Sequence, residues 1–324
     1  MRIRLITPAP PGSRAGNRTT AARWAAILRT LGHRVQISVE YDGADADLMI
    51  ALHAWRSAGA IQRFAAEHPS RPLIVAITGT DAYRFIRSHP EPTLRSIRLA
   101  HRLVGLHALI ADVLPLDQRG KMRVIYQSAL PIRLRDPVKR SFRVCVAGHL
   151  REEKDPLRPA LAVRSLPSSS RIQIHHYGAA HTPGWAAAAS AETALNSRYQ
   201  WHGEVPHHQL RRVFGRSHLL VLPSRMEGGA NVISEAVVAG LPVVASRIPG
   251  SIGLLGEAYP GFYACENSDE LGRVLLRAES ESSFYRQLAE ACEQRRALFT
   301  PESEAAGWNM LLKELVKNPG KFGC

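Results

Sequence analysis

The sequence has few cysteines and lacks any long apolar run. No stretch of about 18 apolar residues is present, which excludes a predicted membrane-spanning helix. The start, Met1 to Pro11, lacks the apolar segment of about 7 to 15 residues that is typical of a secretory signal. The four cysteines lie far apart and form no Cys-x-x-Cys pair, so neither a zinc framework nor a disulfide scaffold is expected. We therefore expect a cytoplasmic protein of a reducing compartment, without stable membrane insertion.

Aromatic residues are also few, at 6%, whereas positive charge is in excess. The chain has 42 Lys and Arg against 28 Asp and Glu, a net charge of +14, which favours an anionic partner such as nucleic acid, an acidic membrane surface or a phosphorylated small molecule. Without interleaved aromatics or a known nucleic-acid motif, a nucleic-acid-binding module is the weaker alternative, and we expect no nucleic-acid partner.

The 324 residues, 45% of them apolar, are enough for about two folded domains. In the first half, apolar runs predict strands at Ile3–Ile6, Val35–Val39, Leu48–Leu52, Leu73–Ile77 and Val124–Tyr126, with helices from Thr19, at Ala58–Glu67 and at Leu94–Leu103. After a proline-bounded stretch, strands are predicted at Val144–Ala147, Ile172–His175, Leu219–Leu222 and Val243–Ala245, with helices at Leu157–Ser165, Ala186–Leu195, Gln209–Arg216 and Val232–Ala239.

This double alternation is typical of an α/β protein with two doubly wound, Rossmann-like domains that face each other across a cleft. We expect the first domain over residues 1–135 and the second over 136–300. A last helix and tail, 301–324, is expected to pack back on the first domain.

The segment from Leu219 to Gly250 carries the most specific pattern, LLVLPSRMEGGANVISEAVVAGLPVVASRIPG. Two glycines, Gly228 and Gly229, allow a ligand to approach the backbone closely, and Asn231 is placed to cap a helix whose amino end suits a phosphate. Glu227 precedes that helix and Glu235 lies one turn inside it. Because carboxylates only accept hydrogen bonds, the pair suits sugar hydroxyls attached to the phosphate.

A second, basic turn follows the first strand of this half, in the stretch VAGHLREEKDP. Gly148 permits the turn, and Arg151 and Lys154 are placed to act as point charges on a diphosphate. The neighbouring Glu152 and Glu153 leave open the reading of a surface charge run.

Taken together, the two segments resemble the carboxyl-terminal half of a GT-B glycosyltransferase of family four. The resemblance rests on Glu227 and Glu235 with seven residues between them, and on the turn from Gly148 to Lys154. It also rests on the segment that leads into the motif, WHGEVPHHQLRRVFGRSHLLVLPS. It implies that Glu235 binds the ribose, that Glu227 meets the donor sugar and that Lys154 neutralises the leaving diphosphate. It also implies that the backbone amides of a short segment meet sugar and phosphate: Gly228, Gly229, Ala230 and Asn231. The family has Arg where this chain has His149, and Arg151 is the candidate replacement.

The amino-terminal half resembles a narrower subgroup, the selenosugar synthases of selenoneine-type pathways. The resemblance is carried by TPAPPGSRAGNRTTAARWAAILRTLGHRV, DADLMIALHAWRSA, ITGTDAYR and VIYQSA. It implies a reaction in which selenophosphate attacks a UDP-sugar and a 1-selenosugar, UDP and phosphate are formed. It also implies pathway partners, namely a selenophosphate synthetase upstream and a selenoneine synthase downstream. The alternative is a UDP-sugar-dependent transferase that acts on a saccharide, a lipid or a small alcohol.

Several residues of this half are candidates for an anionic acceptor or for the chemistry. His53 follows a strand, at a place where relatives often carry a His beside the donor sugar, and it is a candidate for charge stabilisation or proton transfer. Asp81 is a candidate to orient a hydroxyl or a histidine. The acceptor candidates are Arg14, Gly16, Asn17, Arg18, Arg56, Thr80 and Asp81.

No metal or other cofactor is expected beyond the donor substrate. Asp45 and Asp47 form an Asp-x-Asp pattern, but they precede a strand, so we interpret them as structural. The two His-His pairs, at 175–176 and 207–208, have no Cys or carboxylate at metal-ligand spacing.

Overall fold

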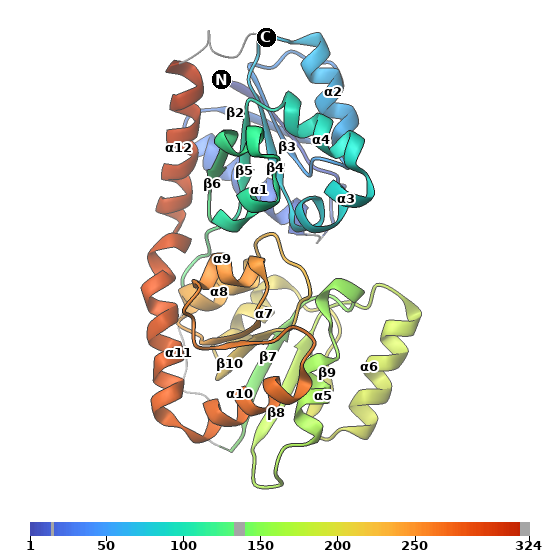
Figure 1. Cartoon of the computed structure of the whole chain (residues 1–324), viewed down its shortest axis with the longest axis vertical. Coiled ribbons are helices and arrows are strands. Elements are labelled where there is room, and N and C mark those ends of the chain that lie inside the picture. Colours follow the sequence, from blue (N-terminus) through green and yellow to red (C-terminus); the bar gives the residue numbers. More distant parts are fainter. Residues whose placement is uncertain (14–15, 133–139, 318–324) are drawn as a thin grey trace. The chain divides into compact units, whose positions relative to one another are not determined.

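The computed structural model describes residues 1–13, 16–132 and 140–317. These residues form two compact units: unit 1 comprises Met1–Gln127 with the residues from Pro301 onward, and unit 2 comprises Ser128–Thr300. Each unit contains one parallel sheet of six strands (Figure 1).

The sheet of unit 1 has the strand order β2-β1-β3-β4-β5-β6, and all its pairings are parallel. Its strands are β1 (Arg2–Ile6), β2 (Arg34–Ser38), β3 (Leu48–Leu52), β4 (Leu73–Ile77), β5 (Arg102–Gly105) and β6 (Met122–Val124). Its helices are α1 (Gly16–Thr30), α2 (Ala58–Glu67), α3 (Ile86–Ser88), α4 (Pro90–Leu99) and α12 (Pro301–Lys317).

Both faces of the unit 1 sheet are covered, which is why every residue of β3 and β4 is buried. On one face the ring of Trp24 in α1 meets Trp308 in α12 with ring centroids 4.7 Å apart, and the indole N–H of Trp24 donates to Glu304 at 2.8 Å. On the other face Phe64 of α2 packs into a separate cluster. Truncating either tryptophan to Ala is expected to cost about 3–5 kcal/mol of stability, so α12 is an integral part of unit 1.

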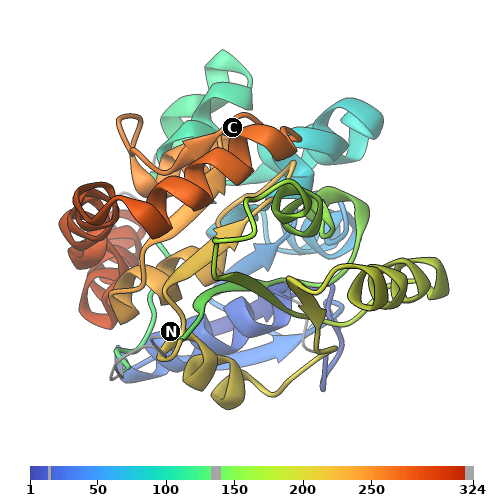
Figure 2. The same ribbon diagram turned by 90° about the horizontal axis from the view of Figure 1, so that it is seen from below.

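The sheet of unit 2 has the order β12-β11-β10-β7-β8-β9, again with parallel pairings throughout. Its strands are β7 (Phe142–Ala147), β8 (Ile172–Tyr177), β9 (Tyr199–Trp201), β10 (Leu219–Leu222), β11 (Val243–Ser246) and β12 (Phe262–Tyr263). Its helices are α5 (Arg158–Arg164), α6 (Pro183–Leu195), α7 (His207–Phe214), α8 (Asn231–Ala239), α9 (Pro249–Leu255), α10 (Ser268–Ser280) and α11 (Ser282–Arg295). Figure 2 shows α6 extending outward beyond the β8–β9 edge of this sheet.

The strand order reverses direction once in each sheet. In unit 1 the chain runs from β1 to β2 on one side and then returns to place β3 on the other side of β1. In unit 2 it runs from β7 through β8 to β9 and then returns to place β10 beside β7. Ligands of open parallel sheets bind at such switch points, outside the carboxyl ends of the strands. The loops after β1 and β3, and after β7 and β10, are therefore the places to examine.

Three local predictions were wrong. The strand expected at Val124–Tyr126 lies two residues earlier, at Met122–Val124. The helix expected over Leu94–Leu103 ends at Leu99, because Ala100 is extended and Leu103 is buried in strand β5. The apolar run there fits a helix or a buried strand equally well, and pairing with β4 decides it. Asn231 does not cap α8: it is the first helical residue, and Ala230 takes the cap position without a side-chain hydrogen bond. The short edge strands β9 and β12 lack a sequence signal of their own and were not predicted.

Candidate functional site

The loops after β7 and β10 lie side by side because these two strands are parallel neighbours. They bring together Lys154, in a short helical turn at Glu152–Lys154, and Glu227, just before α8. The Lys154 Nζ lies 2.5 Å from Glu227 Oε1, and only 20% and 9% of the two side chains are exposed. Two of the residues predicted from the sequence are thus joined in one largely desolvated ion pair.

The position of Glu227 is fixed by further contacts. The Ser224 hydroxyl donates to Glu227 Oε1 at 2.6 Å, and the Ser246 hydroxyl in turn donates to the Ser224 carbonyl at 2.5 Å. A Cβ at Gly250 would lie 2.2 Å from the Glu227 carbonyl oxygen, so only glycine permits this approach. Sequence reasoning missed Ser224 and Gly250, although both lie within the quoted motif.

The backbone between Glu227 and α8 has the conformation that its glycines allow. Gly229 has φ of 146°, in the region that favours glycine, and Gly228 and Ala230 are buried. The helix ends, as predicted, at Gly240 in the left-handed conformation. The first turn of α8 carries no acidic side chain, so the positive end of its dipole is not neutralised there.

Glu235 lies one turn inside α8, and its carboxylate is only partly paired. Oε1 is 3.1 Å from Nε2 of His207, a residue that the sequence analysis considered only as a metal ligand. Within the described part of the chain, Oε2 is buried and has no hydrogen-bond partner. Such an acceptor is costly to leave unpaired, so it indicates a place for a donor from a ligand. The hydrogen bond to Glu235 raises the pKa of His207.

In the basic turn, His149 stands where family four carries Arg. Its Nδ1 accepts the Ala179 N–H at 3.1 Å, and burial, followed by repulsion from His181, lowers the pKa of His149. A neutral His149 does not replace the positive charge of the Arg that family four carries. Arg151 lies 3.2 Å from Glu153, and its buried Nε has no partner among the described residues.

Gly148 supplies its backbone rather than a side chain. Its carbonyl lies 3.0 Å from the His176 Nε2, and a Cβ on Gly178 would come within 2.0 Å of the same oxygen. The turn after β7 is therefore held against the loop after β8.

In unit 1, His53 and Asp81 follow the neighbouring strands β3 and β4 and are joined directly. His53 Nδ1 lies 2.6 Å from Asp81 Oδ1, and both side chains are almost fully buried. His53 has φ of 77°, a costly conformation for a non-glycine residue, which is retained only where the surroundings hold it. The Thr80 hydroxyl lies 3.1 Å from His53 Nε2.

Asp81 is held by several donors besides His53. Its Oδ2 accepts the N–H of Ala54 and the N–H and hydroxyl of Thr78, all within 3.0 Å, and its Oδ1 accepts the N–H of Trp55. Nδ1 of His53 also lies 3.3 Å from the backbone N of Arg56, but its closer contact with the carboxylate favours the tautomer in which Nδ1 carries the proton and Nε2 accepts from Thr80. The structure thus places Asp81 as the residue that orients His53.

The remaining acceptor candidates of unit 1 form no network like that of His53 and Asp81 among the described residues. Arg14 lies outside the described residues. Gly16, Asn17 and Arg18 form the first turn of α1, and Nη1 of Arg18 is buried without a partner within the described ranges. Arg56 is exposed and lies three residues after His53.

In the Asp-x-Asp pattern both carboxylates form ion pairs: Asp45 pairs with Arg2 and Arg71, and Asp47 pairs with Arg2 at 2.7 Å. In residues 1–13, 16–132 and 140–317, no group of three or more His, Cys, Asp or Glu side chains is placed to hold a metal ion. None of the helices in these ranges has the length and apolar character needed to cross a membrane.

Comparisons with known proteins bear on both units. Residues 135–295 match the family model described as "Glycosyl transferases group 1". A protein of Bacillus subtilis (strain 168), named "Putative teichuronic acid biosynthesis glycosyltransferase TuaC", is 23% identical over 289 residues, which cover 83% of this chain and 70% of that protein.

Two solved structures resemble the whole chain. Anabaena HepE in complex with UDP has a TM-score of 0.76 at 16% identity, covering 97% of this chain and 100% of that one. Sucrose-phosphate synthase from Thermosynechococcus elongatus has a TM-score of 0.76 at 15% identity, covering 98% and 99%. With the two parallel six-stranded sheets, these similarities confirm the GT-B fold class predicted from the sequence.

Proposed function

We propose that this chain, which has the GT-B fold and matches the model of glycosyl transferases group 1 over residues 135–295, is a glycosyltransferase that transfers a sugar from a UDP-sugar to an acceptor hydroxyl. The observation that carries the proposal is the arrangement at the β7–β10 switch point of unit 2. There Lys154 and the buried Glu227 form an ion pair, and Glu235 keeps one buried carboxylate oxygen that has no partner among the residues the structure describes. We assign the donor to unit 2 and the acceptor to unit 1.

The open oxygen of Glu235 suits a ribose hydroxyl. A hydroxyl that donates to an ionised carboxylate forms a charge-assisted hydrogen bond, which is stronger than one between neutral groups. His207 holds the other oxygen in the free protein and has to share Glu235 with the nucleotide. That HepE has a structure in complex with UDP supports a uridine nucleotide as the donor.

Lys154 and Glu227 bind the two remaining parts of the donor, the diphosphate and the sugar. Negative charge grows on the diphosphate as the glycosidic bond breaks, and a fixed ammonium group nearby stabilises that charge. In the free protein Glu227 is the ion-pair partner of Lys154. With the donor bound, the diphosphate takes over as the partner of Lys154, and Glu227 is left to accept hydrogen bonds from the sugar. With Lys154 and Arg151 supplying the charge, the proposal requires no resident metal ion.

For the acceptor we favour a hydroxyl of a saccharide, a lipid or a small alcohol. The support is the family match together with the names of the relatives, a teichuronic acid biosynthesis glycosyltransferase and a sucrose-phosphate synthase. Selenophosphate, implied by the resemblance of the amino-terminal half, is the second candidate. Nη1 of Arg18 is buried and unpaired within the described ranges, which favours an anion at the first turn of α1.

One experiment separates these acceptors. Purified protein is incubated with UDP-glucose or UDP-GlcNAc and with an alcohol, a saccharide or selenophosphate, while UDP release and product mass are recorded. Glycosylation of a hydroxyl supports the main proposal. A selenium-bearing sugar, formed with UDP and phosphate in the absence of hydroxyl transfer, replaces it with the second candidate.

Calorimetry tests the donor site by itself. Glu235→Ala removes charge-assisted hydrogen bonds worth roughly 1.5–3 kcal/mol, so the affinity for UDP should fall about 10- to 150-fold. Glu290→Ala, on the exposed face of α11, is the matched control and should bind UDP normally. Equal affinity of all three proteins would remove Glu235 from the nucleotide site.

A further inference from the structure

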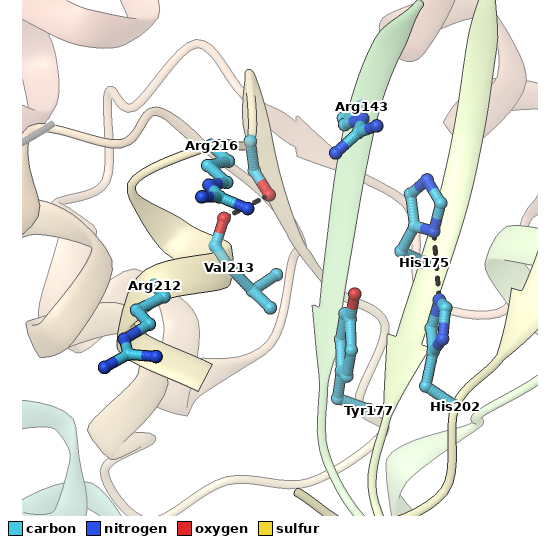
Figure 3. A pocket seen from close by; sticks show the side chains of 8 residues that line it. Arg143, His175, Tyr177, His202, Arg212, Val213 and Arg216 are labelled. Atoms are coloured by element: carbon cyan, nitrogen blue, oxygen red, sulfur yellow. Dashed lines mark hydrogen bonds between the residues drawn. The ribbon is translucent and has the colours of Figure 1, made fainter. Parts of the chain in front are cut away.

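Unit 2 contains a cavity that shares no lining residue with the donor site. It has a volume of about 310 Å³ and lies between the sheet and α7, with walls formed by β7, β8, α7 and the residues beyond β9 (Figure 3). This volume lies at the lower end of the range found for small-molecule sites.

One side of the cavity is strongly basic. Arg143 enters from β7, while Arg212 lies on α7 and Arg216 just beyond it. No acidic residue lines the cavity, and within the described ranges none of these three guanidinium groups pairs with a carboxylate. The Nε atom of Arg143 is buried and has no hydrogen-bond partner among the described residues. A buried donor without an acceptor is costly, and three unbalanced charges together favour an anion.

The opposite side is made of flat rings. Tyr177 stacks on His202 with centroids 4.5 Å apart and planes 8° apart, and His202 in turn stacks on His175, with Nδ1 of His175 3.0 Å from Nε2 of His202. Figure 3 shows Tyr177 between His202 and Val213, so that one face of its ring is turned toward α7. Burial, with smaller contributions from His202 and Arg143, lowers the pKa of His175 to about 4, which keeps this wall uncharged near pH 7.

We propose that this cavity binds an organic phosphate that carries a planar ring, with the phosphate at the three arginines and the ring against Tyr177. Guanidinium groups suit phosphate because their N–H donors match its oxygens in pairs. Stacking of the ligand's ring on an aromatic side chain adds affinity whatever the identity of the ring. The site is independent of the donor site, and it does not rest on the proposed sugar transfer.

A neighbouring cavity of about 610 Å³ provides an internal comparison. It is lined in part by Arg211, and it shares Arg212 and Arg216 with the first cavity. Arg143 lines only the first cavity and Arg211 lines only the second. Variants of these two residues therefore report on one cavity each.

The test is calorimetric titration of the full chain with phenyl phosphate, which contains the ring and the phosphate but no ribose. Inorganic phosphate and phenol serve as the two half-ligands. We expect phenyl phosphate to bind at least tenfold more tightly than either half-ligand. Arg143→Gln should weaken it at least tenfold, and Tyr177→Leu should abolish its advantage over inorganic phosphate.

Three controls make the result specific. Arg211→Gln and Arg273→Gln, the latter on the exposed face of α10, should bind phenyl phosphate as the unaltered chain does. UDP affinity should be unchanged in Arg143→Gln, which shows that the unit is folded and keeps the two sites distinguishable. Undetectable binding of phenyl phosphate, or equal binding by Arg143→Gln, would overturn the proposal.

A last titration with AMP separates two sources of the same chemistry. Tighter binding of AMP than of phenyl phosphate, lost in Arg143→Gln, supports a nucleotide as the natural ligand. Weaker binding, also lost in that variant, supports an aryl phosphate. AMP binding that is insensitive to Arg143→Gln belongs elsewhere on the protein and counts against a nucleotide in this cavity.

Discussion

The polar groups at the two switch points differ in how completely they are paired. In unit 1, His53 and Asp81 are buried together, and each oxygen of Asp81 accepts at least two hydrogen bonds. In unit 2, Lys154 and Glu227 pair with each other, but Glu235 keeps one buried oxygen without a partner in the described ranges.

This difference separates a fixed group from groups that exchange partners. A fully bonded network holds one side chain in one orientation and one tautomer, which suits a residue that acts at a single atom. A pair with an open acceptor beside it can trade its internal partner for a ligand. We therefore interpret unit 1 as presenting a preorganised imidazole and unit 2 as a site that rearranges its ion pair around a donor.

Removing the charge of Lys154 should have the largest effect. Lys154→Ala takes away the group that stabilises the leaving diphosphate, and we expect kcat to fall about 10²- to 10³-fold, with a smaller change in KM for the UDP-sugar. Steady-state rates of UDP release measure this. Lys313→Ala, on the exposed side of α12, should retain full activity. An unaltered kcat in Lys154→Ala would show that Lys154 does not stabilise the leaving diphosphate, and it would contradict the role given to unit 2.

The second prediction concerns how Glu227 is positioned. In Gly250→Ala the new Cβ would lie 2.2 Å from the Glu227 carbonyl oxygen and 2.7 Å from its Cβ, so the loop has to shift. Because misplacement by about 1 Å costs about 10²-fold in rate, activity should fall by that order. Gly59→Ala, whose Cβ would meet nothing within 4 Å, is the control. Normal activity in Gly250→Ala would show that the position of Glu227 is not critical.

For unit 1 we expect a loss of stability rather than of nucleotide binding. Asp81→Asn replaces an oxygen that accepts by an amide that donates, so at least one buried N–H loses its acceptor, at a cost of about 1.5–3 kcal/mol. Urea unfolding should show the loss, and calorimetry should show unchanged affinity for UDP. Asp112→Asn, at an exposed position, should have neither effect. A weakened UDP affinity in Asp81→Asn would contradict the assignment of the nucleotide to unit 2.

The smallest effect is a dependence on pH through His207. Its pKa is raised by Glu235, so the stabilising pair is complete below the ordinary value near 6.5 and is lost as the pH rises through the raised value. Ribose competes for Glu235, and UDP affinity should therefore rise a few-fold over that interval. The effect is small because 62% of the His207 side chain is exposed.

Calorimetry of UDP binding across this interval measures the dependence. His207→Ala should flatten it, and His208→Ala should leave it in place. A pH dependence that is identical in all three proteins would show that His207 does not compete with the nucleotide.

The sequence predicted the switch-point loops well because their signals are local. Apolar strand runs followed by Gly148 or by Gly228 and Gly229 mark a strand end with room for a ligand, and the spacing of Glu227 and Glu235 follows from one helix start. Ser224, Gly250 and His207 could not be found in this way. Gly250 and His207 act through contacts with residues distant in the chain, such as the approach of Gly250 to Glu227. Ser224 lies only three residues before Glu227, but the direction of its hydroxyl depends on the fold of the loop, in which Ser246 holds the Ser224 carbonyl.

The errors also have local physical causes. At Asn231 the chain enters the helix one residue earlier than the capping preference indicated, because Ala230 already takes the extended cap conformation. For His149 the sequence predicted no role of its own, because its contacts depend on burial and on the Ala179 N–H, which no sequence pattern reveals.

The most direct test of the account is a crystal structure of the protein with UDP bound. We predict that the ribose hydroxyls lie within hydrogen-bond distance of Glu235, that the diphosphate lies beside Lys154, and that the hydrogen bond from His207 to Glu235 is broken or lengthened. Nucleotide density away from the loops after β7 and β10, with Glu235 and Lys154 unchanged, would contradict it.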